Sequence, residues 1–179
     1  MCYYITLVVR GADDATIAKI ADRYGRLAKR IDNRSVASVL AANEAQYLTT
    51  VGHCDCGTAL APKASHAADR RKEQAVKLAK QGWSRAKIER WLSDREKADN
   101  RAEERRHRDT SDSIELWSKI VHDIVSTPGV EEAGLLLHYY SRNVEAEVFE
   151  PRQEKVSIHQ FAARLANMCE DELLMARRA

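Results

Sequence analysis

The sequence predicts an α+β protein: a small mixed sheet of about four strands, covered by amphipathic helices, with an inserted charged helical hairpin. Seven glycines and three prolines in 179 residues leave few turns, so the elements should be long. Frequent alanine and a 31% share of charged residues favour helices. Short β-branched apolar runs alternate with stretches of helical periodicity, and no repeat or low-complexity linker divides the chain. We therefore expect residues 1–179 to form a single domain, with residues 64–110 as the inserted hairpin.

The N-terminal third of the chain predicts strands on either side of a helix. Residues 2–9 are apolar at both alternating positions, which is typical of a central strand covered on both faces. Apolar residues then recur at helical spacing over residues 17–31, after Asp13, whose acidic side chain suits a helix N-terminus. Residues 35–42 fit a helix by spacing and a strand by β-branched content, so both interpretations stay open. Residues 47–51 favour a strand.

Residues 64–108 differ from the rest of the chain because charge dominates and apolar positions are few. Gly82-Trp83-Ser84 is the only interruption, which predicts two helices joined in a hairpin. The second helix begins with a short apolar stripe, and residues 94–109 are almost wholly polar. Opposite charges four residues apart can hold such a solvated helix together. We expect this arm to project from the body of the protein.

The strongest helical stripe covers residues 114–125. It follows a capping-box pair, Asp112 and Glu115, and stops at Pro128-Gly129. This helix should belong to the core.

The C-terminal third predicts two strands and a last helix. Residues 134–140 are largely apolar, and residues 144–148 alternate between apolar and charged, so the second strand should face water on one side. Residues 141–143 between them suit a hairpin turn. A last amphipathic helix over residues 158–169 should dock on the body. Placing residues 2–9 beside the first of these strands gives a split βαβ arrangement.

Charge is balanced overall and segregated locally. A net charge of +2 argues against a surface wholly dedicated to nucleic acid or membrane. Residues 61–110 hold 15 basic and nine acidic residues, whereas residues 111–179 hold seven basic and 12 acidic. Because the acidic residues of the arm would repel phosphate, we expect no nucleic-acid partner. We interpret residues 80–92 as a helical hairpin and not as a DNA-binding helix-turn-helix, because helical hairpins are common and no asparagine or glutamine stands beside an arginine at a base-reading position.

The sequence predicts a cytoplasmic protein with reduced thiols. Its longest apolar run falls far short of the roughly 20 residues that a bilayer span needs, so no membrane association is expected. The N-terminus lacks the basic region and small-residue cleavage site of a signal peptide. Four cysteines are too few for a disulfide framework in a chain of this length.

His53-Cys54-Asp55-Cys56 is the least ordinary local sequence. Thiolate and imidazole are preferred zinc ligands, so Cys54, Cys56 and His53 are candidate metal ligands, with zinc as the cofactor they would hold. The Cys-x-Cys spacing lacks the second cysteine pair of common zinc sites. A reduced structural loop is the alternative, and a direct disulfide between the two cysteines would be strained. Only residues that folding brings close could complete a site, namely Cys2, His66 or His138.

Cys2 follows the initiator methionine and opens the predicted central strand. Removal of Met1 would leave its thiol beside a free amine that can act as a base. This start resembles that of the N-terminal-nucleophile amidohydrolases and the glutamine amidotransferases, which implies a catalytic Cys2. The likeness covers two residues, Tyr3 stands where the amidotransferases commonly have glycine, and their Asn-Gly and Gly-Asp loops are absent. A buried strand residue is the other interpretation of Cys2.

The remaining sequence favours a binding module over an enzyme, because it contains no Gly-rich phosphate loop, His-Glu-x-x-His or Gly-x-Ser-x-Gly motif. The leading hypothesis is a non-catalytic protein-interaction or regulatory module that uses the charged arm. Trp83, Trp91 and Arg90 are its candidate contacts, because aromatic and arginine side chains carry most interface energy. The partner would be another protein or a second copy of the chain. The alternative is a metal-binding or thiol-dependent protein that uses Cys54 and Cys56.

Overall fold

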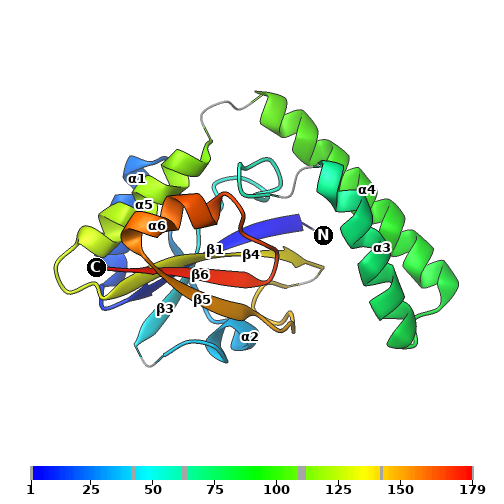
Figure 1. The fold of residues 1–179 in the computed structure, drawn as a ribbon, viewed down its shortest axis with the longest axis horizontal. Coiled ribbons are helices and arrows are strands. Elements are labelled where there is room, and N and C mark those ends of the chain that lie inside the picture. The colour runs from blue at the N-terminus through cyan, green and yellow to red at the C-terminus, as the bar shows by residue number, and fades with distance from the viewer. Residues whose placement is uncertain (1, 42, 62–63, 109–111, 142, 179) are drawn as a thin grey trace.

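The structure, a computed structural model, describes residues 2–41, 43–61, 64–108, 112–141 and 143–178. Within these ranges it contains six strands in one mixed sheet and six helices, which confirms the α+β class (Figure 1). None of the helices described combines the length and apolar character that a membrane span requires. The elements in chain order are β1 (Cys2–Arg10), α1 (Asp14–Arg23), β2 (Lys29–Ile31), α2 (Arg34–Ala37), β3 (Glu44–Leu48), α3 (Ala64–Lys80), α4 (Arg85–Arg108), α5 (Ile114–Ser126), β4 (Glu132–Tyr140), β5 (Arg152–Ser157), α6 (Ile158–Leu165) and β6 (Glu172–Arg177).

The strand order is β2-β3-β1-β4-β6-β5, so the first strand lies inside the sheet as predicted. β1 pairs with β4 along nine residues, from Cys2 opposite Tyr140 to Arg10 opposite Glu132, and the two strands are antiparallel. β5 and β6 are parallel, and the other pairs are antiparallel. The predicted sheet of about four strands is too small, because β2, β5 and β6 were not expected. β4 pairs with β6 only as far as Leu136, so its last residues extend past the start of β6.

The two faces of the sheet are covered unequally. Helices α1, α5 and α6 lie over one face (Figure 1), where the main core includes the fully buried Ile5 and Trp117. On the opposite face, a smaller cluster around Leu136 and Met175 packs against partly buried residues that include Phe149. The predicted core helix is therefore confirmed as α5.

Two predicted elements of the chain take a different form. The helix expected over residues 17–31 ends early, because Gly25 adopts a left-handed φ of +64° and the chain returns as β2. Residues 144–148 contain a turn and no strand, and the side-chain amide of Asn33 donates to two of their carbonyl oxygens. Arg142, in the predicted hairpin turn, lies outside the described residues.

The C-terminal region also differs in detail. The helix predicted over residues 158–169 ends at Leu165, and the chain continues into β6, a buried inner strand. At the start of α5, Ser113 is the N-cap and accepts a hydrogen bond from the helix backbone. Asp112, the expected cap, instead binds the guanidinium of Arg26.

α3 and α4 contact each other and are joined through Gly82, which adopts a left-handed conformation (φ +83°), and they extend beside one end of the sheet (Figure 1). The middle of α4 is anchored to the body, because Ala98 belongs to the main core and Asp99 is buried. Trp91, a candidate protein contact on an arm that the sequence predicts to be exposed, is instead buried, with 9% of its surface accessible. Residues 109 and 110, the end of the predicted insertion, lie outside the described ranges.

Candidate functional site

The loop after β3 carries two of the four cysteines and lies against the start of β1. The amide of Asp55 donates to the carbonyl oxygen of Tyr3 at 2.9 Å, and the amide of Tyr3 donates to Cys56 Sγ at 3.3 Å. The amide of Ile5 donates to the Asp55 carboxylate at 2.9 Å. These bonds hold the loop alongside β1, which places its thiols next to the first residue of the strand.

Three thiols meet where this loop crosses β1. The Sγ atoms of Cys2, Cys54 and Cys56 all lie within 4.8 Å of one another, and we call these residues the thiol cluster. Cys56 is buried, and Cys54 is half-buried. Of the residues that could complete a site, folding therefore brings Cys2 to the cysteine pair. His53 has an exposed side chain, and its carbonyl oxygen accepts a hydrogen bond from the Tyr4 hydroxyl at 3.0 Å.

Crowding favours the protonated form of these thiols. Burial, followed by the neighbouring Cys54, raises the pKa of Cys2 above its usual value. A hydrogen bond with Cys54, followed by burial, raises the pKa of Cys56. A bound cation would offset the negative charge that three adjacent thiolates accumulate. The cluster can therefore exchange protons for a soft cation, and this exchange would be favoured by higher pH.

Asp55 lies between the two loop cysteines in sequence, but its side chain points into the protein. The carboxylate accepts hydrogen bonds from the amide of Ile5 and from the Thr50 hydroxyl at 2.5 Å, and it lies 3.6 Å from the guanidinium of Arg26. Burial raises the pKa of Asp55 to about 6, although these hydrogen bonds favour its ionised form. Asp55 therefore fixes the loop and is no ligand candidate.

A second cluster lies at the end of β4, where ligand atoms of His138, Glu170 and Asp171 lie within 4.8 Å of one another. His138 Nδ1 lies 2.5 Å from Asp171 Oδ1, and the imidazole stacks on Phe149 with ring centroids 3.7 Å apart. His138 Nε2 is buried and has no hydrogen-bond partner among the described residues. A carboxylate on one ring nitrogen fixes the orientation of the other, which is then able to bind a ligand. The side chain of His66 lies outside the described part of the chain.

Arg95 of α4 ties the arm to the sheet. Its Nη2 atom donates to Glu170 at 2.8 Å and to the Tyr3 hydroxyl at 2.6 Å. The guanidinium also lies 3.5 Å from the ring centroid of Tyr139, and the side chain is 5% exposed. This buried arginine belongs to the stretch over residues 94–109 that the sequence predicts to be solvated.

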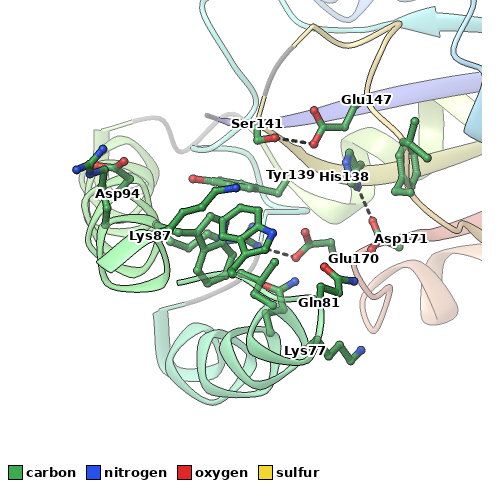
Figure 2. Close-up of a pocket in the computed structure, with 18 of the residues that line it drawn as sticks. Lys77, Gln81, Lys87, Asp94, His138, Tyr139, Ser141, Glu147, Glu170 and Asp171 are labelled. Atoms are coloured by element: carbon green, nitrogen blue, oxygen red, sulfur yellow. Dashed lines mark hydrogen bonds and ion pairs between the residues drawn. The ribbon is translucent and has the colours of Figure 1, made fainter. Parts of the chain in front are cut away.

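A cavity of about 720 Å³ lies between the arm, the end of β4 and the segment that precedes β5 (Figure 2). Trp83, Trp91 and Arg90, the predicted protein contacts, all line it. Trp83 is half-buried, and Arg90 is exposed. These three residues therefore border a hollow and do not form a flat surface. The cavity wall opposite the arm includes His138, Tyr139, Glu147, Phe149, Glu170 and Asp171.

Comparisons with protein-family models, curated proteins and solved structures found no match for this chain. No family membership follows. The functional assignment therefore rests on the geometry of the residues described above.

Two functional features are missed by sequence reasoning. Asp171 pairs with His138 from a position 33 residues away, and it does so in a left-handed conformation (φ +64°) that no local pattern announces. Arg95 looks like any other charged residue of the arm, and only its position opposite Tyr3 and Glu170 makes it buried. Either role could be predicted only if one knew which residues far apart in the sequence are in contact, and a single sequence does not contain that information.

Proposed function

We propose that this protein binds a soft divalent cation such as zinc through Cys2, Cys54 and Cys56. The observation that carries the proposal is the convergence of three Sγ atoms, from two separate segments, within 4.8 Å of one another. Zinc–thiolate bonds of about 2.3 Å place sulfur atoms about 3.8 Å apart at tetrahedral corners, so small side-chain adjustments suffice. Three thiolates leave the fourth position to solvent or to an incoming ligand.

Two further contacts support this assignment. The amide of Tyr3 donates to Cys56 Sγ, and a hydrogen bond of this kind stabilises a metal-bound thiolate. Asp55 holds the loop in place through the amide of Ile5, so the ligands are positioned before the ion arrives. We leave His53 out of the ligand set because its side chain is exposed.

Zinc titration of the fully reduced chain, without an affinity tag, tests the proposal. We expect one equivalent of Zn²⁺ to bind, and Co²⁺ used as a spectroscopic substitute to show thiolate-to-cobalt charge transfer. Cys54→Ser should lower the zinc affinity at least about tenfold. Cys169→Ser is the matched control, because this exposed cysteine lies outside the cluster and its loss should change nothing. The absence of stoichiometric zinc, or equal affinity in Cys54→Ser and the unmodified chain, would contradict the proposal.

A second copy of the chain docked on the arm is the second candidate, and it extends the protein-interaction hypothesis. Val76 on α3 is 56% exposed and Val148 beside the cavity is 89% exposed, which leaves large apolar side chains in water. The burial of Trp91 weighs against this candidate. Sedimentation equilibrium should show a concentration-dependent dimer that Val76→Glu weakens. A monomer at every concentration would remove this candidate.

A further inference from the structure

The cavity beside the arm has the size and lining of a small-molecule site. Its volume of about 720 Å³ falls within the roughly 300–1,000 Å³ typical of ligand pockets. Aromatic side chains contribute from both walls, with Trp83 on the arm and Phe149 opposite. Polar groups also line the cavity, among them Lys87, His138 and Asp171, which Figure 2 labels.

The arm wall presents cations without carboxylate partners. Lys77, Lys87 and Arg90 line the cavity, and none of them forms an ion pair within the described residues. Lys87 Nζ lies 3.6 Å from the ring centroid of Trp83, so the ammonium group is held over this aromatic face.

The acidic groups of the opposite wall are largely occupied by their own partners. Glu170 pairs with Arg95 at 2.8 Å, and Asp171 lies 2.5 Å from the imidazole of His138. One oxygen of Glu147 accepts a hydrogen bond from the Ser141 hydroxyl, whereas its other oxygen is buried and has no hydrogen-bond partner within the described residues. Among the lining charges that have no ion-pair partner within the described residues, the three cations Lys77, Lys87 and Arg90 outnumber the two carboxylates Asp94 and Glu147.

The lining contains four buried polar atoms that have no hydrogen-bond partner within the described residues, on Gln74, His138, Tyr139 and Glu147. His138 is only 7% exposed, and its Nε2 atom has no hydrogen-bond partner within the described residues. Leaving such an atom unpaired carries a desolvation cost that a bound group would recover. Stacking on Phe149 and the contact with Asp171 hold the imidazole in one orientation.

We propose that this cavity binds a small organic anion that carries a planar ring. The anionic group lies at Lys87 and Arg90, the ring packs against Trp83, and a polar atom of the ligand pairs with His138 Nε2. The site is separate from the thiol cluster and does not depend on a metal ion.

Calorimetric titration of the full chain with 1-naphthyl phosphate tests the proposal, with 1-naphthol and inorganic phosphate as partial ligands. We expect 1-naphthyl phosphate to bind at least about tenfold tighter than either partial ligand. Lys87→Gln should weaken its binding about fivefold, as the loss of one partly solvated ion pair implies. Lys80→Gln is the matched control, because it removes the same charge from an exposed position of the arm that does not line the cavity.

Three results would overturn the proposal. The first is no binding of 1-naphthyl phosphate. The second is equal affinity for either partial ligand, which would remove the need for the ring or for the charge. The third is an equal loss in Lys80→Gln and Lys87→Gln, which would indicate general charge attraction. His138→Gln tests the contact with Nε2 through 5-hydroxy-1-naphthyl phosphate, whose hydroxyl can donate to that atom. Weaker binding in the variant at an unchanged unfolding temperature supports the contact, and unchanged binding would contradict it.

Discussion

The guanidinium of Arg95 lies over the ring of Tyr139 on β4, 3.5 Å from the ring centroid. The same group donates to Glu170 and to the Tyr3 hydroxyl, so α4 is held to both β1 and β4 by one side chain. A cation in this position is stabilised by aromatic faces and a carboxylate together. α4 is therefore anchored to the sheet through Arg95.

Arg95→Ala should lower the free energy of unfolding by about 3 kcal/mol, because it leaves the buried carboxylate of Glu170 without its cation. Lys97→Ala, on the exposed face of the same helix, should change it by less than about 0.5 kcal/mol. Urea unfolding followed by circular dichroism measures both values. Equal effects of the two substitutions would mean that the arm contributes nothing through this contact.

Gly134→Ala should be destabilising by about 3 kcal/mol. The residue lies on β4 between β1 and β6, and a Cβ atom there would clash with the carbonyl oxygen of Leu174 and with Met175. Gly52→Ala is the control, because a Cβ at that position would meet nothing within 4 Å. Thermal unfolding should separate the two variants, and a Gly134→Ala protein as stable as Gly52→Ala would show that the strands can move apart at this point.

Stability should fall at alkaline pH. Burial, followed by Asp14, raises the pKa of Tyr47 to about 12, and burial also raises the pKa of Tyr140 to about 12. Between pH 10 and pH 12 these phenols are ionised in the unfolded chain and neutral in the folded protein. The folded state then binds more protons, so each phenol lowers the free energy of unfolding by up to about 1.4 kcal/mol per pH unit.

Urea unfolding at pH 9, 10 and 11 measures this decline. Tyr47→Phe should make the fall less steep, because phenylalanine has no proton to lose. Stability that stays level across these three pH values would contradict the burial of both phenols.

The four thiols should differ in their rate of reaction with a disulfide reagent at neutral pH. Cys169 is exposed and should react first, whereas Cys56 is buried, has a raised pKa and should react last. With saturating Zn²⁺, the proposed site predicts one fast thiol and three protected ones. Cys169→Ser should abolish the fast phase, and zinc that leaves all four rates unchanged would argue against metal ligation.

The sequence could predict the elements whose signal is local. Residues 2–9 are apolar at both alternating positions, and this pattern requires a strand with two covered faces, as β1 has. The helical periodicity that predicts α5 is likewise visible within the residues of that helix alone. β6 could not be predicted in this way, because its short apolar run follows a helical pattern directly, and periodicity does not separate a short buried strand from a buried helical turn.

The same distinction applies to the candidate site. Cys54 and Cys56 stand out in the sequence because only one residue separates them and residues of other ligand types lie beside them. The arrival of Cys2 depends on the pairing of the loop with β1, which is a tertiary contact between residues more than 50 positions apart. The roles of Arg95 and Asp171 are likewise set by partners distant in the chain.

Tyr3 connects the thiol cluster with the arm. Its main-chain N–H donates to Cys56 Sγ, and its hydroxyl accepts a hydrogen bond from Arg95. A metal ion that draws the three Sγ atoms together would shift the main chain at Tyr3. The Tyr3 side chain and the Arg95 side chain bonded to it would then move as well. By thermodynamic linkage, the factor by which zinc changes the affinity of the cavity for its ligand then equals the factor by which that ligand changes the affinity of the thiol cluster for zinc.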